Sequence, residues 1–231
     1  GSPRVKKTLA ENGVKCSAKT VAKIMRQGGL CAMKKKSFRP KTTIRKKEDL
    51  VAPNLLEAKK VEAPNQAWVG DITYVPVRGG WLYLSAWMDR YSRKIVGWDI
   101  QCHMRSDIVE EALKQGIAKR CPDKGLLIHS DRGSQYACHK FHQCVKSSGL
   151  IQSMAACGYC YDNAHMESFW STLKNEALPP GGFFDDIKHA RLCLFDYIEA
   201  YYNRKRLHSS LGYLSPEKFE DLIQHSNYRS N

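Results

Sequence analysis

Short apolar runs alternate with polar turns between residues 68 and 153, which is the pattern of a strand-rich domain. The first three runs are separated by compact turn sequences at 78–80 and 89–93, so they predict an antiparallel meander. Two shorter apolar runs come later, each after a helical pattern. The five predicted strands are 68–77, 81–88, 94–101, 125–129 and 151–153.

Helical periodicity fills the spaces between and after the later strands. Ser106 is a candidate N-cap for the first of these helices, with Ile108, Ala112 and Leu113 facing inward, and Gly149 ends the second. The predicted helices are 107–120, 136–148 and 163–178, and residues 155–164 read as a loop with Asp162 at the start of the third helix. The order βββαβαβα predicts an α/β fold with a mixed sheet flanked by helices.

Two short helical patterns open the chain. Residues 4–12 form the first, ended by Gly13, and Ser17 is an N-cap candidate for the second, over 18–27. Two short helices with a tight connection and a basic second helix are typical of a helix-turn-helix. A generic basic helical hairpin is the alternative.

The chain ends in further helices. Residues 185–206 read as one long helix, and Ser215 and Pro216 begin another. Five large apolar or aromatic side chains of the long helix are predicted to belong to the core: Leu192, Phe195, Ile198, Tyr201 and Tyr202.

The net charge of +14 is concentrated at the N-terminus. Residues 1–60 hold 17 Lys/Arg and 4 Asp/Glu, a net charge of +13, whereas residues 61–231 hold 20 and 19, a net charge of +1. A polycationic segment of this kind indicates a phosphate backbone as its partner, and the absence of an amphipathic Trp- or Phe-rich face argues against a membrane. No signal peptide or long apolar run is found, and the odd count of nine cysteines fits reduced thiols in a cytoplasm.

Three acidic residues stand in unusual contexts. Asp71 interrupts an otherwise apolar strand, and Asp131 directly follows another strand and opens a polar turn. Glu167 lies early in the predicted helix 163–178, with 35 residues (132–166) between it and Asp131. Such positions can converge in an α/β fold, where sites gather at the ends of strands. Clustered carboxylates suit Mg²⁺ or Mn²⁺, and paired divalent ions are a common device for phosphoryl transfer on nucleic acids.

The sequences WVGDITYVP, HSDRGSQY and CYDNAHMESFWSTLKNE together resemble the DDE catalytic core of the IS-three family of insertion-sequence transposases, in particular its OrfB product. The C-terminal segment YNRKRLHSSLGYLSPEKF resembles the same family. The resemblance runs from about residue 3 to about residue 222. It implies an RNase H-like fold, as in retroviral integrases, and a transposase that cuts and joins DNA at the ends of an insertion sequence. It assigns Asp71, Asp131 and Glu167 as catalytic and metal-binding residues, with two Mg²⁺ ions for which Mn²⁺ can substitute.

The resemblance and the helical spacing also suggest DNA contacts. Lys174 is two helical turns after Glu167 on the same face, and the family places a lysine there against the element's end. Further expected DNA-binding residues are Asn163, Arg132, Lys19, Lys23 and Arg26. The expected partners are terminal-repeat and target DNA, further copies of the chain in a synapse, and an OrfA product, on the bacterial nucleoid.

Four segments follow from these observations: a partial helix-turn-helix-like module (1–33), a basic linker (34–62), an RNase H-like catalytic core (63–178) and a C-terminal helical extension (179–231). Two alternatives stay open. The first is a truncated, inactive relic that only binds DNA, because the chain begins Gly-Ser-Pro and residues 154–158 contain no basic residue. A general RNase H-like nuclease is the other.

Overall fold

The structure, a computed structural model, describes residues 1–31, 50–156 and 163–229. Five strands form one mixed sheet in the order β3-β2-β1-β4-β5. The strands are β1 (Ala67–Val77), β2 (Gly80–Asp89), β3 (Ile95–Gln101), β4 (Leu127–Ser130) and β5 (Ile151–Met154). β1, β2 and β3 are antiparallel neighbours, whereas β4 is parallel to β1 and β5 is parallel to β4. The predicted meander, mixed sheet and element order are confirmed.

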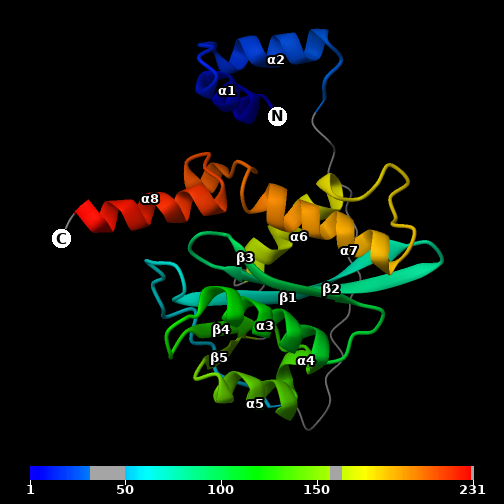
Figure 1. The fold of residues 1–231 in the computed structure, drawn as a ribbon, viewed down its shortest axis with the longest axis vertical. Helices are drawn as coiled ribbons and strands as arrows, with labels where there is room; N and C mark the ends of the chain where they lie inside the picture. The colour runs from blue at the N-terminus through cyan, green and yellow to red at the C-terminus, as the bar shows by residue number, and fades with distance from the viewer. Residues whose placement is uncertain (32–49, 157–162, 230–231) are drawn as a thin grey trace.

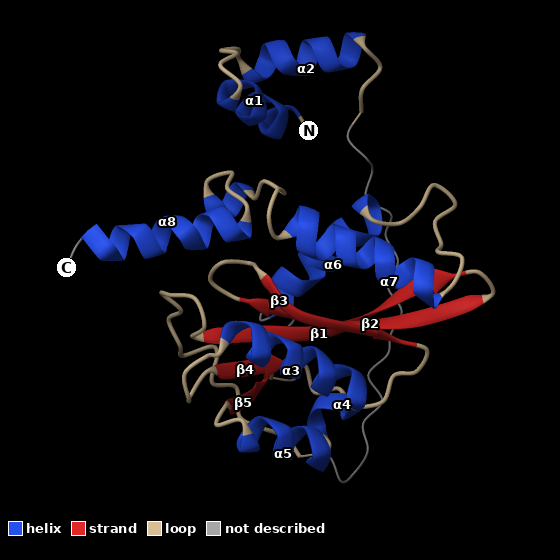
Figure 2. Cartoon of the chain, in the orientation of Figure 1, coloured by secondary structure: helices blue, strands red, loops and turns tan. Residues whose placement is uncertain are grey.

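Helices cover both faces of this sheet (Figure 1, Figure 2). One face carries α3 (Asp107–Arg120), α4 (Ser134–Ala137) and α5 (His139–Ser147), and the other carries α6 (Ala164–Glu176) and α7 (Ile187–Phe195). Each helical layer closes its own apolar cluster, and Leu113 and Phe141 mark one while Phe169 and Leu194 mark the other. The sheet is therefore the middle layer of three.

The remaining elements lie outside the three layers. A π-helix (Asp196–Tyr202) continues α7, a 3-10 helix covers Ser209–Leu211, and α8 spans Pro216–Arg229. The N-terminal pair is α1 (Ser2–Glu11) and α2 (Ala18–Gln27). Ser17 caps α2 as predicted, since its side chain accepts a hydrogen bond from the Thr20 amide at 3.0 Å. No helix in the described ranges has the length and apolar character needed to cross a membrane.

The helix predicted over 136–148 is in fact two helices. Cys138 has extended backbone angles, φ −78° and ψ 151°, and separates α4 from α5. The break lets two rings pack on one tryptophan. Phe141 stacks on Trp87 at 6.0 Å between ring centroids, while Tyr136 meets the same ring edge-on at 5.9 Å.

The expected capping role of Ser106 is also wrong. Ser106 has helical backbone angles and makes no capping hydrogen bond. Instead, the Asp107 side chain accepts a hydrogen bond from the Ile108 amide at 3.0 Å. The inward orientation of Ile108, Ala112 and Leu113 is confirmed, because each is fully buried.

The long helix near the C-terminus does not bury all of its predicted core residues. Ile198 and Tyr202 are buried, but Leu192, Phe195 and Tyr201 are 69%, 54% and 42% exposed. Within α7 the buried side chains are Ala190 and Leu194, and Leu192 and Phe195 lie on the opposite face of the same helix. The stripe read from the sequence is therefore the wrong face of α7.

A glycine sets how closely α3 approaches the sheet. A Cβ atom at Gly97 in β3 would lie 2.1 Å from the Ala112 carbonyl oxygen and 2.7 Å from the Gly116 amide nitrogen. Backbone therefore packs directly on backbone at this point.

Candidate active site

The strand register brings two of the three predicted acids together. β1 and β4 are parallel neighbours, and Val69 is paired with His129. Asp71 lies two residues beyond Val69 in β1, and Asp131 lies two residues beyond His129, so the parallel pairing carries both acids toward the same end of the two strands. Asp131 follows the last residue of β4, where the chain leaves the sheet. A polar turn directly after a buried parallel strand is a common location for a site.

The electrostatics confirm that these side chains interact. Burial, followed by the charge of Asp131, raises the pKa of Asp71 from 3.8 to about 7. The negative charge of Glu167 raises this pKa further, whereas hydrogen bonds from the Ile72 amide and the Trp170 indole lower it. Burial also raises the pKa of Asp131, and a hydrogen bond from the Gly133 amide at 2.9 Å opposes the shift. The pair therefore holds more negative charge than its surroundings stabilise.

Helix α6 supplies the third acid and a fixed partner for the first. Trp170 Nε1 donates a hydrogen bond to Asp71 Oδ2 at 2.9 Å, which ties α6 to the centre of β1. Glu167 lies three residues earlier on the same side of α6 and is exposed. In the described ranges, no three His, Cys, Asp or Glu side chains are close enough together to hold a metal ion. The structure thus joins Asp71 and Asp131, with Glu167 near enough to act through its charge alone.

Lys174 lies next to this cluster. Burial lowers the pKa of the Lys174 ammonium, and the Asp71 charge opposes that shift. With 3.6 residues per turn, Asn163, Glu167, Trp170 and Lys174 form one stripe along α6. The stripe carries an amide, a carboxylate, an indole donor and a cation toward the same edge of the sheet.

Comparison of the sequence with known proteins identifies the family to which the chain belongs. Residues 61–160 and 148–216 match two integrase core domain families, and residues 1–38 match an HTH-like domain. The transposase for insertion sequence element IS904 of Lactococcus lactis is 41% identical over 221 residues, which cover 95% of this chain and 87% of the relative. Transposase InsF for insertion sequence IS3A of Escherichia coli is 39% identical over 222 residues, which cover 96% and 76%. The chain belongs to the IS-three family of transposases.

The fold of the transposase is that of integrase cores. The crystal structure of the catalytic core domain of BIV integrase is similar with a TM-score of 0.53 and 17% sequence identity, over 71% of this chain and 99% of that one. The RNase H-like fold expected from the sequence is thereby confirmed, with an N-terminal HTH-like domain.

The structure gives Arg132 a partner within the transposase. Its Nε donates a hydrogen bond to the Ala155 carbonyl oxygen at 2.7 Å, and the Ala155 amide donates to the Ser130 carbonyl oxygen at 2.9 Å. These bonds fasten the turn after β4 to the end of β5. A phosphate contact of Arg132 stays a prediction. The loop residues 157–162, which include Asp162, lie outside the described residues.

The basic residues of α2 are available on its surface. Lys19, Lys23 and Arg26 are all exposed and follow an i, i+4, i+7 spacing, so they share one face of the helix. Val21 is buried against α1. The linker residues 34–49 lie outside the described residues.

Sequence reasoning missed two residues of the site. Trp170 is one helical turn after Glu167, and this spacing could have identified it. Tyr136 is fully buried, and burial, followed by the charges of Asp71 and Asp131, raises the pKa of its hydroxyl well above 10. Its only sequence signal is its place five residues after Asp131.

Proposed function

We propose that the transposase cleaves and joins DNA strands at the ends of an insertion sequence, with Asp71, Asp131 and Glu167 as its catalytic carboxylates. The observation that carries this proposal is the charge of Asp131 acting on the buried Asp71, whose pKa burial and that charge raise to about 7, with the parallel pairing of β1 and β4 bringing the two acids to the same end of the strands. A carboxylate pair that repels itself in this way is suited to a cation.

The donor set fits divalent metal ions. Carboxylate oxygens are the ligands that Mg²⁺ and Mn²⁺ prefer, and the repulsion among Asp71, Asp131 and Glu167 is the kind that such an ion removes. Two ions are expected, held by Asp71 and Asp131 with Glu167 completing the second site. When bound, they would activate the attacking oxygen and stabilise the leaving one.

The other side chains of the site position the reactants. The Trp170 indole holds Oδ2 of Asp71 and the Ile72 amide holds Oδ1, so both oxygens of this carboxylate are fixed in place. The Lys174 ammonium lies close to Asp71 and can bind a DNA phosphate beside the reacting bond. Asn163 begins the same stripe and is proposed to contact the DNA backbone.

The rest of the chain is proposed to hold DNA. Lys19, Lys23 and Arg26 present a basic helix face that can bind phosphates or enter a groove. Arg132 is proposed to add a contact next to Asp131. The proposed segments are a helix-turn-helix-like module (1–33), a basic linker (34–62), a catalytic core (63–178) and a helical extension (179–231). Terminal-repeat and target DNA, further copies of this chain and an OrfA product are the proposed partners.

Strand transfer by the full chain tests this function directly. The substrate is a pre-cut oligonucleotide from the element's own terminal repeat, with plasmid as target and Mn²⁺ in the buffer. The variants are Asp131→Asn and Glu167→Gln, and Asp123→Asn is the matched control because Asp123 is an exposed aspartate outside the site. We expect joined product from the wild type and the control, and none from the two site variants.

Each other result has a defined meaning. Product from Asp131→Asn at the wild-type rate would refute the assignment of this carboxylate. DNA binding without product from any protein would favour the inactive relic. Cleavage without preference for the terminal repeat would favour a general nuclease.

A further inference from the structure

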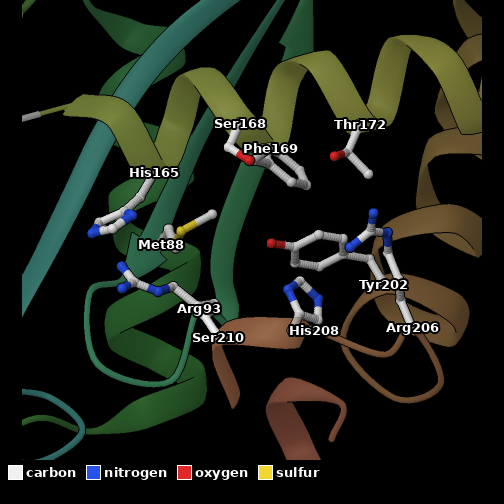
Figure 3. Close-up of a pocket in the computed structure, with 10 residues that line it drawn as sticks. All are labelled: Met88, Arg93, His165, Ser168, Phe169, Thr172, Tyr202, Arg206, His208 and Ser210. Atoms are coloured by element: carbon white, nitrogen blue, oxygen red, sulfur yellow. The ribbon is translucent and has the colours of Figure 1, made fainter. Parts of the chain in front are cut away.

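A second concavity lies on the side of α6 that faces away from the acids. It is an open pocket of about 80 Å³ between α6, the turn after β2 and the chain that follows the π-helix (Figure 3). Its lining comprises Met88, Arg93, His165, Ser168, Phe169, Thr172, Tyr202, Arg206, His208 and Ser210. No residue of the proposed catalytic set belongs to it.

Helix geometry separates this pocket from the catalytic edge. At about 100° per residue, the stripe from Glu167 to Lys174 and the stripe from His165 to Thr172 point roughly 180° apart on α6. α6 therefore carries polar side chains on two opposite faces, one toward the acids and one toward this pocket. An amphipathic core helix would normally keep one of these faces apolar.

Hydrogen-bond donors converge on the pocket from three elements. In Figure 3 the hydroxyls of Ser168 and Thr172 point down from α6, the Tyr202 hydroxyl points in from the right with the His208 ring below it, and the Arg93 guanidinium lies at the left end of the pocket, next to His165. Among the described residues, Arg93 Nη1 and His208 Nε2 are buried and have no hydrogen-bond partner. Buried polar atoms of this kind normally have one.

The pocket also has a positive field. Arg206 is already paired with Glu176, through bonds of 2.8 and 3.0 Å, and so adds little net charge. Arg93 makes no such ion pair; the charge of nearby Asp89 acts on it, but the Asp89 oxygens accept hydrogen bonds from backbone amides. Burial, then Arg93 and Arg90, lower the pKa of His165 to about 4.

The pKa of His208, on the opposite wall of the pocket, is also lowered by burial and by nearby positive charges. Burial, then Arg206 and Arg4, lower its pKa to about 3, and Arg93 lowers it further while Glu176 opposes the shift. Both imidazoles are thus neutral near pH 7 in a cationic setting.

The backbone at Arg93 is held in a strained conformation. Arg93 has φ +64°, in the left-handed region that Gly and Asn adopt most easily. An arginine in this backbone conformation lowers the stability of the fold, and residues with such unusual backbone angles cluster at functional sites.

We propose that this pocket binds a phosphate group, with Arg93 as its principal cation. The volume suits one tetrahedral oxyanion, since a single water needs only about 10–15 Å³ measured in the same way. The hydroxyls of Thr172 and Ser168 and one imidazole N–H would complete the donor set. The phosphate is either a backbone phosphate of a nucleic acid or free phosphate. This site is independent of the catalytic roles proposed for the acids.

Titration with inorganic phosphate tests the proposal on the full chain. The melting temperature is followed at constant ionic strength with EDTA present, so that no divalent ion can recruit phosphate to the acids. Arg93→Asn removes the cation with a residue that tolerates the left-handed backbone. Arg90→Asn is the matched control, because Arg90 belongs to the same turn but lies outside the residues that line the pocket.

We expect phosphate to raise the melting temperature of the wild type and of Arg90→Asn, with binding weaker on the order of tenfold in Arg93→Asn. Thr172→Val keeps the side-chain shape and should weaken binding several-fold, which keeps the test decisive if Arg93→Asn does not fold. The NMR signal of the His208 imidazole should shift with phosphate in the wild type.

A second arm identifies the source of the phosphate. Duplex DNA replaces inorganic phosphate, and its affinity is compared between Arg93→Asn and Arg90→Asn. A loss confined to Arg93→Asn in this arm assigns a backbone phosphate, and a loss confined to inorganic phosphate assigns the free ion. Equal affinities of the two variants in both arms, or no shift of the His208 signal in either, would overturn the proposal.

Discussion

Asp71→Asn should make the metal-free protein more stable at neutral pH while removing its activity. The folded pKa of Asp71 is about 7, against 3.8 for the ordinary carboxyl. Its contribution to stability is therefore fully present below pH 4 and is lost as the pH rises from about 4 to 7, because the folded state binds the proton more tightly. The isosteric amide carries no charge and escapes this loss.

The magnitude follows from the two pKa values. A shift from 3.8 to about 7 costs up to about 4 kcal/mol at pH 8, at about 1.4 kcal/mol for each pH unit. The amide accepts the Trp170 hydrogen bond more weakly and brings its own NH₂ group to be satisfied, which removes about 1–2 kcal/mol of the gain. Some of the Asp71 surface remains exposed, so the net gain is about 2 kcal/mol.

Urea unfolding in EDTA, followed by tryptophan fluorescence, measures this gain. All five tryptophans lie between positions 68 and 170, so the signal reports the catalytic core alone. At pH 8 the variant should unfold at roughly 1 M more urea than the wild type, and the difference should vanish by pH 4. Mn²⁺ should stabilise the wild type and leave the variant unchanged. A difference in unfolding free energy that stays constant from pH 4 to pH 8 would refute the reasoning.

Three further outcomes are expected. Trp170→Phe should raise the pH midpoint of Mn²⁺ binding by about one unit, because the Asp71 carboxylate loses a charged hydrogen bond. The control is Trp98→Phe, which removes an indole hydrogen bond to the remote Glu199 carboxylate and should leave the midpoint unchanged. Equal midpoints for the two variants would contradict this prediction. Lys174→Gln should weaken DNA binding, measured by fluorescence anisotropy, about tenfold. The slope of log affinity against log salt concentration should fall by the equivalent of about one phosphate contact, and an unchanged slope would exclude such a contact. Gly97→Ala should destabilise the core by about 3 kcal/mol in urea unfolding, because α3 must move away from β3. The control Gly80→Ala has open space around the new methyl group and should change the unfolding free energy by no more than about 0.5 kcal/mol. Similar losses in both variants would show that packing at β3 is not the cause.

The sheet could be predicted from the sequence because its signals are local. The turn at 78–80 and the alternation on either side of it define the first hairpin without reference to the rest of the chain. Two of the acids were also visible, since Asp71 is a charge inside the apolar run of β1 and Asp131 directly follows the apolar run of β4. What the sequence alone could not supply was the parallel register of β1 with β4, which brings Asp71 and Asp131 to the same end of the two strands.

The errors arise where distant contacts decide local structure. The break at Cys138 exists because Tyr136 and Phe141 both pack on Trp87, which lies about fifty residues earlier. The pocket beyond α6 was invisible for the same reason, because its lining comes from β2, α6 and the segment after residue 202. Exposed Leu192 shows that an apolar spacing along a helix does not by itself identify the face that packs on the sheet, since α7 buries Ala190 and Leu194 instead.

The parallel pairing of β1 with β4 also has a consequence during synthesis. Leu127 pairs with Ala67, which left the ribosome 60 residues earlier, and α6 comes later still. Contacts over such separations form after the local hairpins, because closing the intervening chain costs entropy. The meander of β1, β2 and β3 can therefore fold while neither Asp131 nor Glu167 has yet been added. If the three acids act as proposed, a partly made chain carries the basic N-terminal segment with only one of them, and it would gain the capacity to cut DNA only when α6 is added.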